Sequence, residues 1–503
     1  MKLFSRFKPQ GGVHPDGRKD LSADRPIRVL PMPERLFVSL QQHVGAPASP
    51  VVVVGEKVLK GQLIAASQGN ISAPVHAPTS GHVAAIGDYL APHPSGLPAP
   101  TITIEPDGED CWAALDVPID PYALEPEEIA KRVAAAGIVG LGGAAFPSAV
   151  KLNISRKTNV QTLIINGGEC EPYLTCDDRI MRERAAAIVS GIRLIQRAVG
   201  CTEALVGIED NKPEAIAAMR EAAKGTDVKV MPVPAMYPMG WDKQMTRALV
   251  GKEVPAGGRS SDIGVLVHNV ATAYAVHEAV ALGRPLISRL VTVSGEAVKI
   301  ACNLEVPLGT PAQALFDYCG GYAGVPARLV MGGPMMGHEM PNPYIPVVKG
   351  TSGVLALTHK EIGQPVPSPC IRCSTCVRAC PVGLLPLEMA AHIRVGDLNT
   401  SVDFGLKDCI ACGSCSYVCP AHIPLVHYFN FAKGELAAKE RAKLKQEGTK
   451  KLAEARNERM EKIARAREEA SRQRAAKKAA QEAAKKAAAD AAAAAAPQQE
   501  ATA

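Results

Sequence analysis

Eight of the 14 cysteines fall in two short segments that share one spacing. The segments are CIRCSTCVRACP, residues 370–381, and CIACGSCSYVCP, residues 409–420, and each fits C-x2-C-x2-C-x3-C-P. Three thiolates at intervals of three residues on a tight loop can surround one iron–sulfur cubane, which needs four thiolates. The proline after the fourth cysteine cannot continue the loop with an N–H donor, so we expect that cysteine to bind the other cluster.

The spacing therefore predicts two 4Fe–4S clusters with crossed ligands. The predicted ligands of the first cluster are Cys370, Cys373, Cys376 and Cys419, and those of the second are Cys409, Cys412, Cys415 and Cys380. The competing interpretation is zinc bound by four cysteines in each site. Zinc ribbons use paired C-x2-C units without a third cysteine three residues later, so the spacing favours iron and sulfur. Two adjacent clusters indicate a one-electron relay.

A second candidate site is the glycine-rich segment GIVGLGGAAFPSAVK, residues 137–151. It follows an expected helix, unlike the strand–turn–helix GxGxxG of a Rossmann domain, and such glycine runs are often only turns. Glycines let backbone N–H groups approach a phosphate closely, and Lys151 can supply a positive charge. The segment NGGECEPY follows, at the end of an expected strand. There Asn166, Glu169 and Glu171 can address the ring or ribose of a nucleotide.

The elements around this second site alternate between helix and strand, which predicts a parallel α/β sheet. We expect helices over 126–136, 176–200 and 213–224, and strands over 159–166, 203–209 and 228–234. Thr175 is the expected N-cap of the helix over 176–200, because an acidic first turn follows it.

Two further regions have the pattern of smaller folded units. Residues 50–105 contain short strand-like runs separated by glycines and prolines at ~8–12-residue intervals, which predicts a small β-sandwich. Residues 285–340 predict a small α+β unit, with strands over 290–295 and 328–333 and a helix over 311–319.

The stretch from Lys433 to Ala503 carries the basic charge of the chain. It holds 18 lysines and arginines against 11 acidic residues, whereas the whole chain has a net charge of +6. It has too few large apolar residues to build a core, so it predicts a solvated helix or disorder. Because the folded body is close to neutral, a nucleic-acid-binding protein is not indicated. No apolar run approaches the ~18–20 residues that span a bilayer, and the first ten residues lack the apolar core of a secretory signal.

Three segments resemble the NADH- and FMN-binding subunit of respiratory complex I. They are GLGGAAFP at 140–147, NGGECEP at 166–172 and HNVATAY at 268–274, where the complex I pattern begins GRGGAGFP and NADESEP. Residues 50–105 resemble the biotinyl/lipoyl carrier fold, although residues 67–81 at the expected hairpin tip contain no lysine for modification. Together with GGVHP near the start and the cysteine repeat, the order of these segments over residues ~1–435 resembles the C subunit of the Rnf ion-translocating oxidoreductase complex.

This resemblance implies cofactors and the residues that hold them. It places FMN among Gly140, Gly142, Gly143, Lys151, Asn166, Glu169, Asn269 and Thr272, and NAD(H) beside Phe146, which would stack, and Glu171. Leu141 and Gly168 stand where the complex I pattern has an arginine and an aspartate.

The expected architecture is a multi-domain α/β and β protein. Its expected parts are an N-terminal segment (1–45), a barrel-sandwich hybrid (46–115), a Rossmann-like α/β FMN/NADH domain (120–280), a β-grasp or SLBB domain (285–345), a two-cluster ferredoxin-like domain (360–430) and a helical or disordered tail (433–503).

The function that the resemblance implies is that of an NADH-facing electron-transfer subunit. It would lie peripherally on the cytoplasmic side of the inner membrane, with the other subunits of an Rnf-type complex as partners and ferredoxin or flavodoxin as an indirect one. Because the cofactors carry the chemistry, no catalytic acid–base residue is expected. Two alternatives stay open: a soluble corrin reductase of bacterial microcompartments, and an electron relay that no longer binds a nucleotide. The intact glycine loop and NGGECEP segment speak against the relay.

Overall fold

The computed structural model describes residues 10–93, 95–363 and 366–494. Residues 1–9, 94, 364–365 and 495–503, which include the outer ends of the expected N-terminal segment and tail, lie outside the described residues. The chain divides into two units, Met1–Asn430 and Phe431–Ala503. Among the described residues, none of the helices combines the length and the apolar character needed to cross a membrane.

A small sandwich of two antiparallel sheets follows the N-terminal segment. One sheet has the order β2 (Leu36–Ser39), β8 (Pro98–Pro106), β7 (Gly81–Leu90) and β4 (Lys57–Val58), and the other has β3 (Ser49–Pro50), β5 (Leu63–Ala66) and β6 (Val75–His76). Leu36, Ile64 and Ile102 fill the space between the sheets and are fully buried. This confirms the expected β-sandwich.

A four-stranded parallel sheet lies at the centre of the nucleotide domain. Its order is β11 (Val228–Val233), β10 (Glu203–Glu209), β9 (Thr162–Gly167) and β12 (Val265–Asn269). These strands are rich in Val, Ile and Leu, as expected for a sheet that is covered on both faces. In the register of β9 and β12, Asn166 is the partner of Asn269, so both residues lie at the carboxyl end of the sheet.

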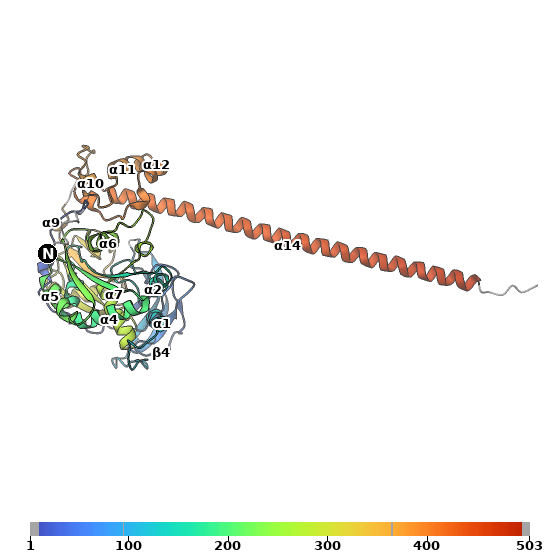
Figure 1. Cartoon of the computed structure of the whole chain (residues 1–503), viewed down its shortest axis with the longest axis horizontal. Coiled ribbons are helices and arrows are strands. Elements are labelled where there is room, and N and C mark those ends of the chain that lie inside the picture. Colours follow the sequence, from blue (N-terminus) through green and yellow to red (C-terminus); the bar gives the residue numbers. More distant parts are fainter. Residues whose placement is uncertain (1–9, 94, 364–365, 495–503) are drawn as a thin grey trace, which may run out of the picture. The chain divides into compact units, whose positions relative to one another are not determined.

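Helices cover both faces of this sheet. They are α1 (Pro126–Ala135), α2 (Ser148–Lys157), α3 (Cys176–Glu183), α4 (Ala185–Val199), α5 (Pro213–Ala222), α6 (Asp242–Val250) and α7 (Val270–Ala281), with a short η3 (Ser260–Ile263). On one face, Leu163 and Ile165 pack with α1, α4 and α7, which lie close to one another in Figure 1. On the other face, Ile164 and Val267 pack with Met245 of α6.

The single helix expected over 176–200 is wrong, because the structure has two helices that meet at Arg184. Arg184 leaves the helical conformation, with φ of −130°. Its guanidinium donates to Glu305 at 2.5 Å and to the Tyr274 hydroxyl at 2.9 Å. The break therefore coincides with contacts that Arg184 makes to distant segments.

A six-stranded mixed sheet forms the next domain, with the order β1 (Arg28–Val29), β14 (Cys302–Pro307), β13 (Ser288–Ser294), β17 (Gly353–Leu357), β15 (Arg328–Met331) and β16 (His338–Glu339). Helix α8 (Ala312–Tyr318) packs on it through Leu315 and Phe316. Strands β1 and β17 come from outside the expected range 285–345.

The cysteine segments form a domain of short helices: α9 (His359–Ile362), α10 (Thr375–Ala379), α11 (Pro386–Arg394), α12 (Leu398–Asp403), η4 (Leu406–Asp408) and α13 (Ser414–Tyr417). The sequence repeat is also a conformational repeat. Arg372 and Ser374 have φ of 56° and 59°, and the equivalent Ala411 and Gly413 have 54° and 79°. These left-handed residues curl each loop tightly around its first three cysteines.

The tail is helical. Helix α14 runs from Leu425 to Ala494, as Figure 1 shows in orange and red, and every residue from 437 to 494 is exposed. Ion pairs at i,i+4 spacing, such as Lys450–Glu454 and Glu468–Arg472, support it without a core. Of the two expected states of the tail, the structure has the solvated helix.

Candidate functional site

Two cavities in the cysteine-rich domain are each lined by four cysteines. The first cavity is lined by Cys370, Cys373, Cys376 and Cys419. The second cavity is lined by Cys380, Cys409, Cys412 and Cys415. Each cavity thus combines three cysteines of one segment with the fourth cysteine of the other, which is the predicted crossed arrangement. Four thiols around one space suit a 4Fe–4S cluster, and their role as ligands stays our prediction.

Backbone N–H groups point at the cysteine sulfurs in a repeated pattern. The N–H of Arg372 donates to Cys370 Sγ at 3.4 Å, and the N–H of Ala411 donates to Cys409 Sγ at the same distance. In the second cavity, the N–H of Leu384 also donates to Cys380 Sγ at 3.4 Å. Hydrogen bonds to sulfur stabilise thiolates and tune the reduction potential of a bound cluster.

The two cavities differ in their surroundings. In the first cavity Cys370 and Cys373 are exposed, whereas in the second cavity three of the four cysteines are buried. The second cavity packs against the nucleotide domain, because the Tyr237 hydroxyl donates to the Cys412 carbonyl at 2.6 Å. Cys170 of the NGGECEP segment joins Tyr237 and Cys412 in one apolar cluster.

The glycine-rich segment forms a closed loop with open space above it. The N–H of Gly140 donates to the Phe146 carbonyl at 2.8 Å, and the N–H of Leu141 donates to Thr272 Oγ1 at 2.9 Å. A Cβ at Gly142 would lie 3.3 Å from the Asn269 side chain. A Cβ at Gly143, whose φ is +95°, would meet nothing within 4 Å. The structure therefore brings the loop together with Asn269 and Thr272, and leaves room at Gly143 for a phosphate.

The two asparagines at the carboxyl end of the sheet are held by the protein. Asn166 Nδ2 donates to the Gly240 carbonyl at 2.8 Å. Asn269 Nδ2 donates to Asp177 Oδ2 at 2.6 Å, and its Oδ1 accepts the N–H of Ala271 as the N-cap of α7. These contacts fix the side chains at the strand ends, where α/β sheets bind ligands.

Lys151 lies close to His268, which is a residue of β12. Lys151 Nζ donates to the Val267 carbonyl at 3.2 Å, and burial lowers the pKa of this lysine. Burial lowers the pKa of His268 to about 3, so its imidazole is neutral. Neither ring nitrogen of His268 has a hydrogen-bond partner among the described residues. A buried imidazole without partners fits a site whose polar groups are completed by a cofactor such as FMN.

Glu169 caps helix α3, which corrects the expected role of Thr175. The carboxylate of Glu169 accepts the N–H groups of Asp177 at 2.8 Å and Asp178 at 3.3 Å, although burial raises its pKa. Thr175 occupies the N-cap position, but its side chain makes no capping bond and instead pairs with Ser22 Oγ at 2.7 Å. A buried carboxylate competes well for these N–H groups, because the helix N-terminus attracts negative charge.

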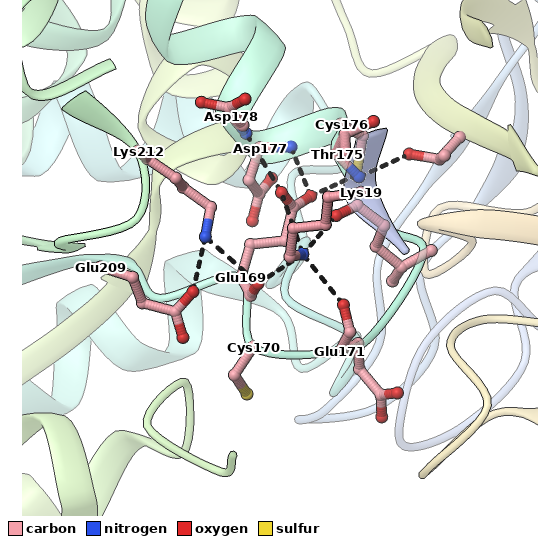
Figure 2. Close-up of polar contacts among 12 residues, drawn as sticks. Lys19, Glu169, Cys170, Glu171, Thr175, Cys176, Asp177, Asp178, Glu209 and Lys212 are labelled. Atoms are coloured by element: carbon pink, nitrogen blue, oxygen red, sulfur yellow. Dashed lines mark hydrogen bonds and ion pairs between the residues drawn. The ribbon is translucent and has the colours of Figure 1, made fainter. Parts of the chain in front are cut away.

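Two lysines hold the loop that carries Glu169 and Glu171, as Figure 2 shows. Lys19 Nζ donates to the carbonyls of Glu169 at 2.8 Å, Glu171 at 3.0 Å and Leu174 at 2.5 Å. Lys212 pairs with Glu209 at 2.5 Å, and both side chains are almost fully buried. Lys19 was not predicted from the sequence, because nothing in a polar N-terminal segment indicates a contact with a loop 150 residues away.

Glu171 is tied to the mixed-sheet domain. Its carboxylate accepts the N–H groups of Met335 at 3.0 Å and Met336 at 2.9 Å. Burial raises the pKa of Glu171 to about 7, although the two hydrogen bonds act in the opposite direction and lower it. Phe146, its expected partner at NAD(H), is half-buried at the end of the glycine loop. The hydrogen bonds of the Glu171 carboxylate therefore lead to residues 335–336 and not to that loop.

Arg289 is a further residue at this site that the sequence did not indicate. It lies on β13, and its Nη2 donates to the Leu141 carbonyl at 2.5 Å. The contact spans 148 residues of sequence, so no local pattern could have found it.

Comparison with known families agrees with this architecture. Family models match for the RnfC barrel sandwich hybrid domain over residues 7–109, the Nuo51 FMN-binding domain over 133–278, the SLBB domain over 290–339 and the 4Fe-4S dicluster domain over 369–423. These matches confirm the expected fold class and support FMN and 4Fe–4S clusters as the cofactors.

Curated relatives match most of the chain. The C subunit of the ion-translocating oxidoreductase complex of Rhodobacter capsulatus is 53% identical over 439 residues, which cover 87% of this chain and 85% of the relative. The corresponding C subunit of Pseudomonas aeruginosa is 44% identical over 90% of this chain and 58% of its own length. The C subunit of the proton-translocating ferredoxin:NAD(+) oxidoreductase complex of Clostridium ljungdahlii is 44% identical over a stretch that covers 87% of this chain and 96% of the relative. The chain therefore belongs to the family of C subunits of ion-translocating oxidoreductase complexes.

Proposed function

We propose that this chain passes electrons between NAD(H) and a ferredoxin- or flavodoxin-level carrier, as the NADH-facing subunit of a membrane-bound ion-translocating complex. The observation that carries the proposal is the difference between the two cavities. The second cavity meets the nucleotide domain through Tyr237 and Cys170, and the first cavity opens to solvent at Cys370 and Cys373. One end of the relay thus faces the nucleotide site, and the other faces a partner.

Two of the residues that would hold the nucleotides, Asn166 and Asn269, lie at the carboxyl end of the parallel sheet. Gly140, Gly142, Gly143, Lys151, Asn166, Glu169, Asn269 and Thr272 would hold FMN, and Phe146 and Glu171 would contact NAD(H). When bound, FMN supplies the exchange between two-electron transfer with NAD(H) and one-electron transfer with the clusters. The protein contributes position: Lys19 and Glu169 fix the loop at 169–174, and Thr272 fixes the glycine loop.

An anaerobic preparation of the full chain tests this proposal. We expect roughly eight iron atoms per chain from two four-iron clusters. We also expect FMN in the heat-released fraction and bleaching of the visible spectrum by NADH. A matched variant, Cys111→Ser, changes an exposed cysteine outside the two segments and should keep all the iron. Zinc in place of iron, or no flavin, would overturn the proposal.

A second candidate is a relay that does not exchange electrons with NAD(H). One observation favours it: both carboxylate oxygens of Glu171 accept backbone N–H groups of residues 335–336, so this side chain is already engaged. Clusters and flavin that are reduced by dithionite but not by NADH would support the relay.

We further propose that the protein lies peripherally on the cytoplasmic side of the membrane. The exposed basic helix from 437 to 494 supports this location, because anionic lipid attracts basic segments. Co-sedimentation with anionic vesicles, with and without residues 433–503, measures this contribution. Equal sedimentation of the two forms would leave the tail without a role in membrane binding.

A further inference from the structure

The guanidinium of Arg289 is buried beside the glycine loop with incomplete hydrogen bonding. The residue is 3% exposed. Its Nη2 donates to the Leu141 carbonyl at 2.5 Å, but its Nε has no hydrogen-bond partner among the described residues. A guanidinium offers five N–H donors in a planar fork, and a buried donor without an acceptor is costly. The chain alone therefore leaves at least one N–H donor of the Arg289 guanidinium without an acceptor.

The charge of Arg289 is also without a direct counterpart. Within the described part of the chain, no carboxylate forms an ion pair with Arg289, whereas Arg182, Arg184 and Lys212 are each paired with at least one. Asp177 is close enough for the guanidinium to oppose the rise that burial gives to its pKa. The Asp177 carboxylate, however, is bound by the Asn269 amide at 2.6 Å. Because buried charges are normally paired, the missing anion points to a ligand.

The position of Arg289 suggests the chemistry of that ligand. Leu141 is held by Thr272, and the neighbouring Gly143 has open space where a Cβ would stand. The segment from Gly137 to Ser148 contains no basic residue, and Lys151, the next basic residue along the chain, donates to the Val267 carbonyl at 3.2 Å, so Arg289 adds a second cation at this loop. The forked guanidinium matches the oxygens of a phosphate better than the point charge of a lysine.

We propose that Arg289 binds the phosphate of the nucleotide held on the glycine loop, and that this phosphate is the one of FMN. The proposal rests on the proposed FMN site and adds a binding residue from the neighbouring domain. Strand β13 of the mixed sheet would thereby contribute a ligand-binding residue to the site in the parallel-sheet domain.

Comparing the Kd of FMN with that of riboflavin distinguishes a contact to the phosphate from a contact to the flavin ring, because riboflavin is FMN without the phosphate. The experiment titrates the full chain, with its clusters and after flavin removal, with FMN and with riboflavin. The variants are Arg289→Met, Arg289→Lys and the control Arg328→Met, which removes an exposed arginine of the same domain that pairs with Glu339.

We expect Arg289→Met to raise the Kd of FMN at least tenfold and to leave the Kd of riboflavin within twofold. Arg289→Lys should lie between wild type and Arg289→Met, since it keeps the charge but loses the fork. Arg328→Met should match wild type for both flavins. Equal losses for FMN and riboflavin in Arg289→Met, or no loss for either, would overturn the proposal.

Thermal unfolding of the flavin-free chain distinguishes a binding role from a structural role. Arg289→Met removes a buried charge without an ion-pair partner, which stabilises the fold, and also removes the hydrogen bond to the Leu141 carbonyl, which destabilises it, so the two effects oppose each other and Tm should change little. A lower Tm together with equal losses for both flavins would show a structural arginine. If Arg289→Met keeps FMN and only raises the KM for NADH, the phosphate belongs to NADH and the assignment to FMN is wrong. Wild type that binds neither flavin would refute the proposed FMN site itself.

Discussion

The two cysteine cavities have the same ligand pattern and different surroundings. Their loops repeat in spacing, in left-handed residues and in N–H···S contacts. The first cavity is open at Cys370 and Cys373, whereas the second has three buried cysteines and packs against Tyr237 and an apolar cluster. Reduction potential and reactivity depend on exposure and on hydrogen bonds to the sulfurs. Identical motifs can therefore give two clusters with different tasks, and the difference comes from what packs on them.

We expect the largest effect from removing one of the two predicted crossed ligands at a time. Cys380→Ala should empty the second cavity and Cys419→Ala the first, each reducing the iron from roughly eight to roughly four atoms per chain. A chelator should then remove the remaining iron quickly in Cys380→Ala, because the first cavity is exposed, and slowly in Cys419→Ala. The same chelation rate in both variants would mean that the cavities do not differ in access.

Glu171→Gln tests the contact that ties the second cavity to the nucleotide loop, since Met335 packs beside Gly413 of that cavity. Burial raises the pKa of Glu171 to about 7, above its ordinary 4.5. Protonated Glu171 thus favours the folded state: its contribution is complete below pH about 4.5 and is lost as the pH rises to about 7.

Thermal unfolding from pH 4 to pH 8 measures this contribution. Relative to Glu171→Gln, wild type should lose roughly 3 kcal/mol across that window, since one pKa unit corresponds to ~1.4 kcal/mol. Glu109→Gln, at an exposed site, serves as the control. A constant difference between wild type and Glu171→Gln at every pH would contradict the raised pKa.

Tyr237→Phe removes the hydrogen bond to the Cys412 carbonyl without changing the ring. We expect a loss of about 1 kcal/mol in the free energy of unfolding and a shift in the potential of the second cluster alone, because the hydrogen bond lies beside that cluster. Redox titration followed by electron paramagnetic resonance reads both clusters. Tyr417→Phe, with an exposed ring, should change neither potential.

The smallest expected effect concerns surface charge at the first cavity, whose lining includes Arg372. Arg372→Gln should slow the reduction of ferricyanide, an anion, by about two- to threefold at low salt, and the difference should vanish at 1 M salt, where charges are screened within ~3 Å. Stopped-flow absorbance measures the rate. Lys407→Gln, which removes an exposed lysine near Cys409, should leave it unchanged.

Local patterns predicted most of the elements and the grouping of the cysteines. The spacing of the cysteines and the alternation of strands and helices are short-range signals, so the parallel sheet could be anticipated. The glycine loop could be anticipated with the help of the resemblance, which also supplied Asn269 and Thr272. Apart from the break at Arg184, the expected helix ends shifted by at most two residues, as usual where caps decide them.

Long-range contacts could not be predicted. Glu169 displaces Thr175 as the capping side chain, and the helix breaks at Arg184, which binds Glu305 and Tyr274. Lys19 and Arg289 reach the site from distant segments. In each case a side chain pairs with a polar group that is distant in sequence and comes close to it only in the folded chain. A single sequence carries no signal for such a pairing.

The N-terminal segment has a consequence for how the protein is made. The N–H of Gly12 donates to the Ala379 carbonyl, and Val13 pairs with Tyr237. Gly12 therefore leaves the ribosome several hundred residues before Ala379 is made, roughly 20–70 s at ordinary rates of synthesis. Until then, the N–H of Gly12 lacks its acceptor, and none of the residues that line the second cavity has been made. Docking of the N-terminal segment on the cysteine-rich domain is thus a late step of biogenesis.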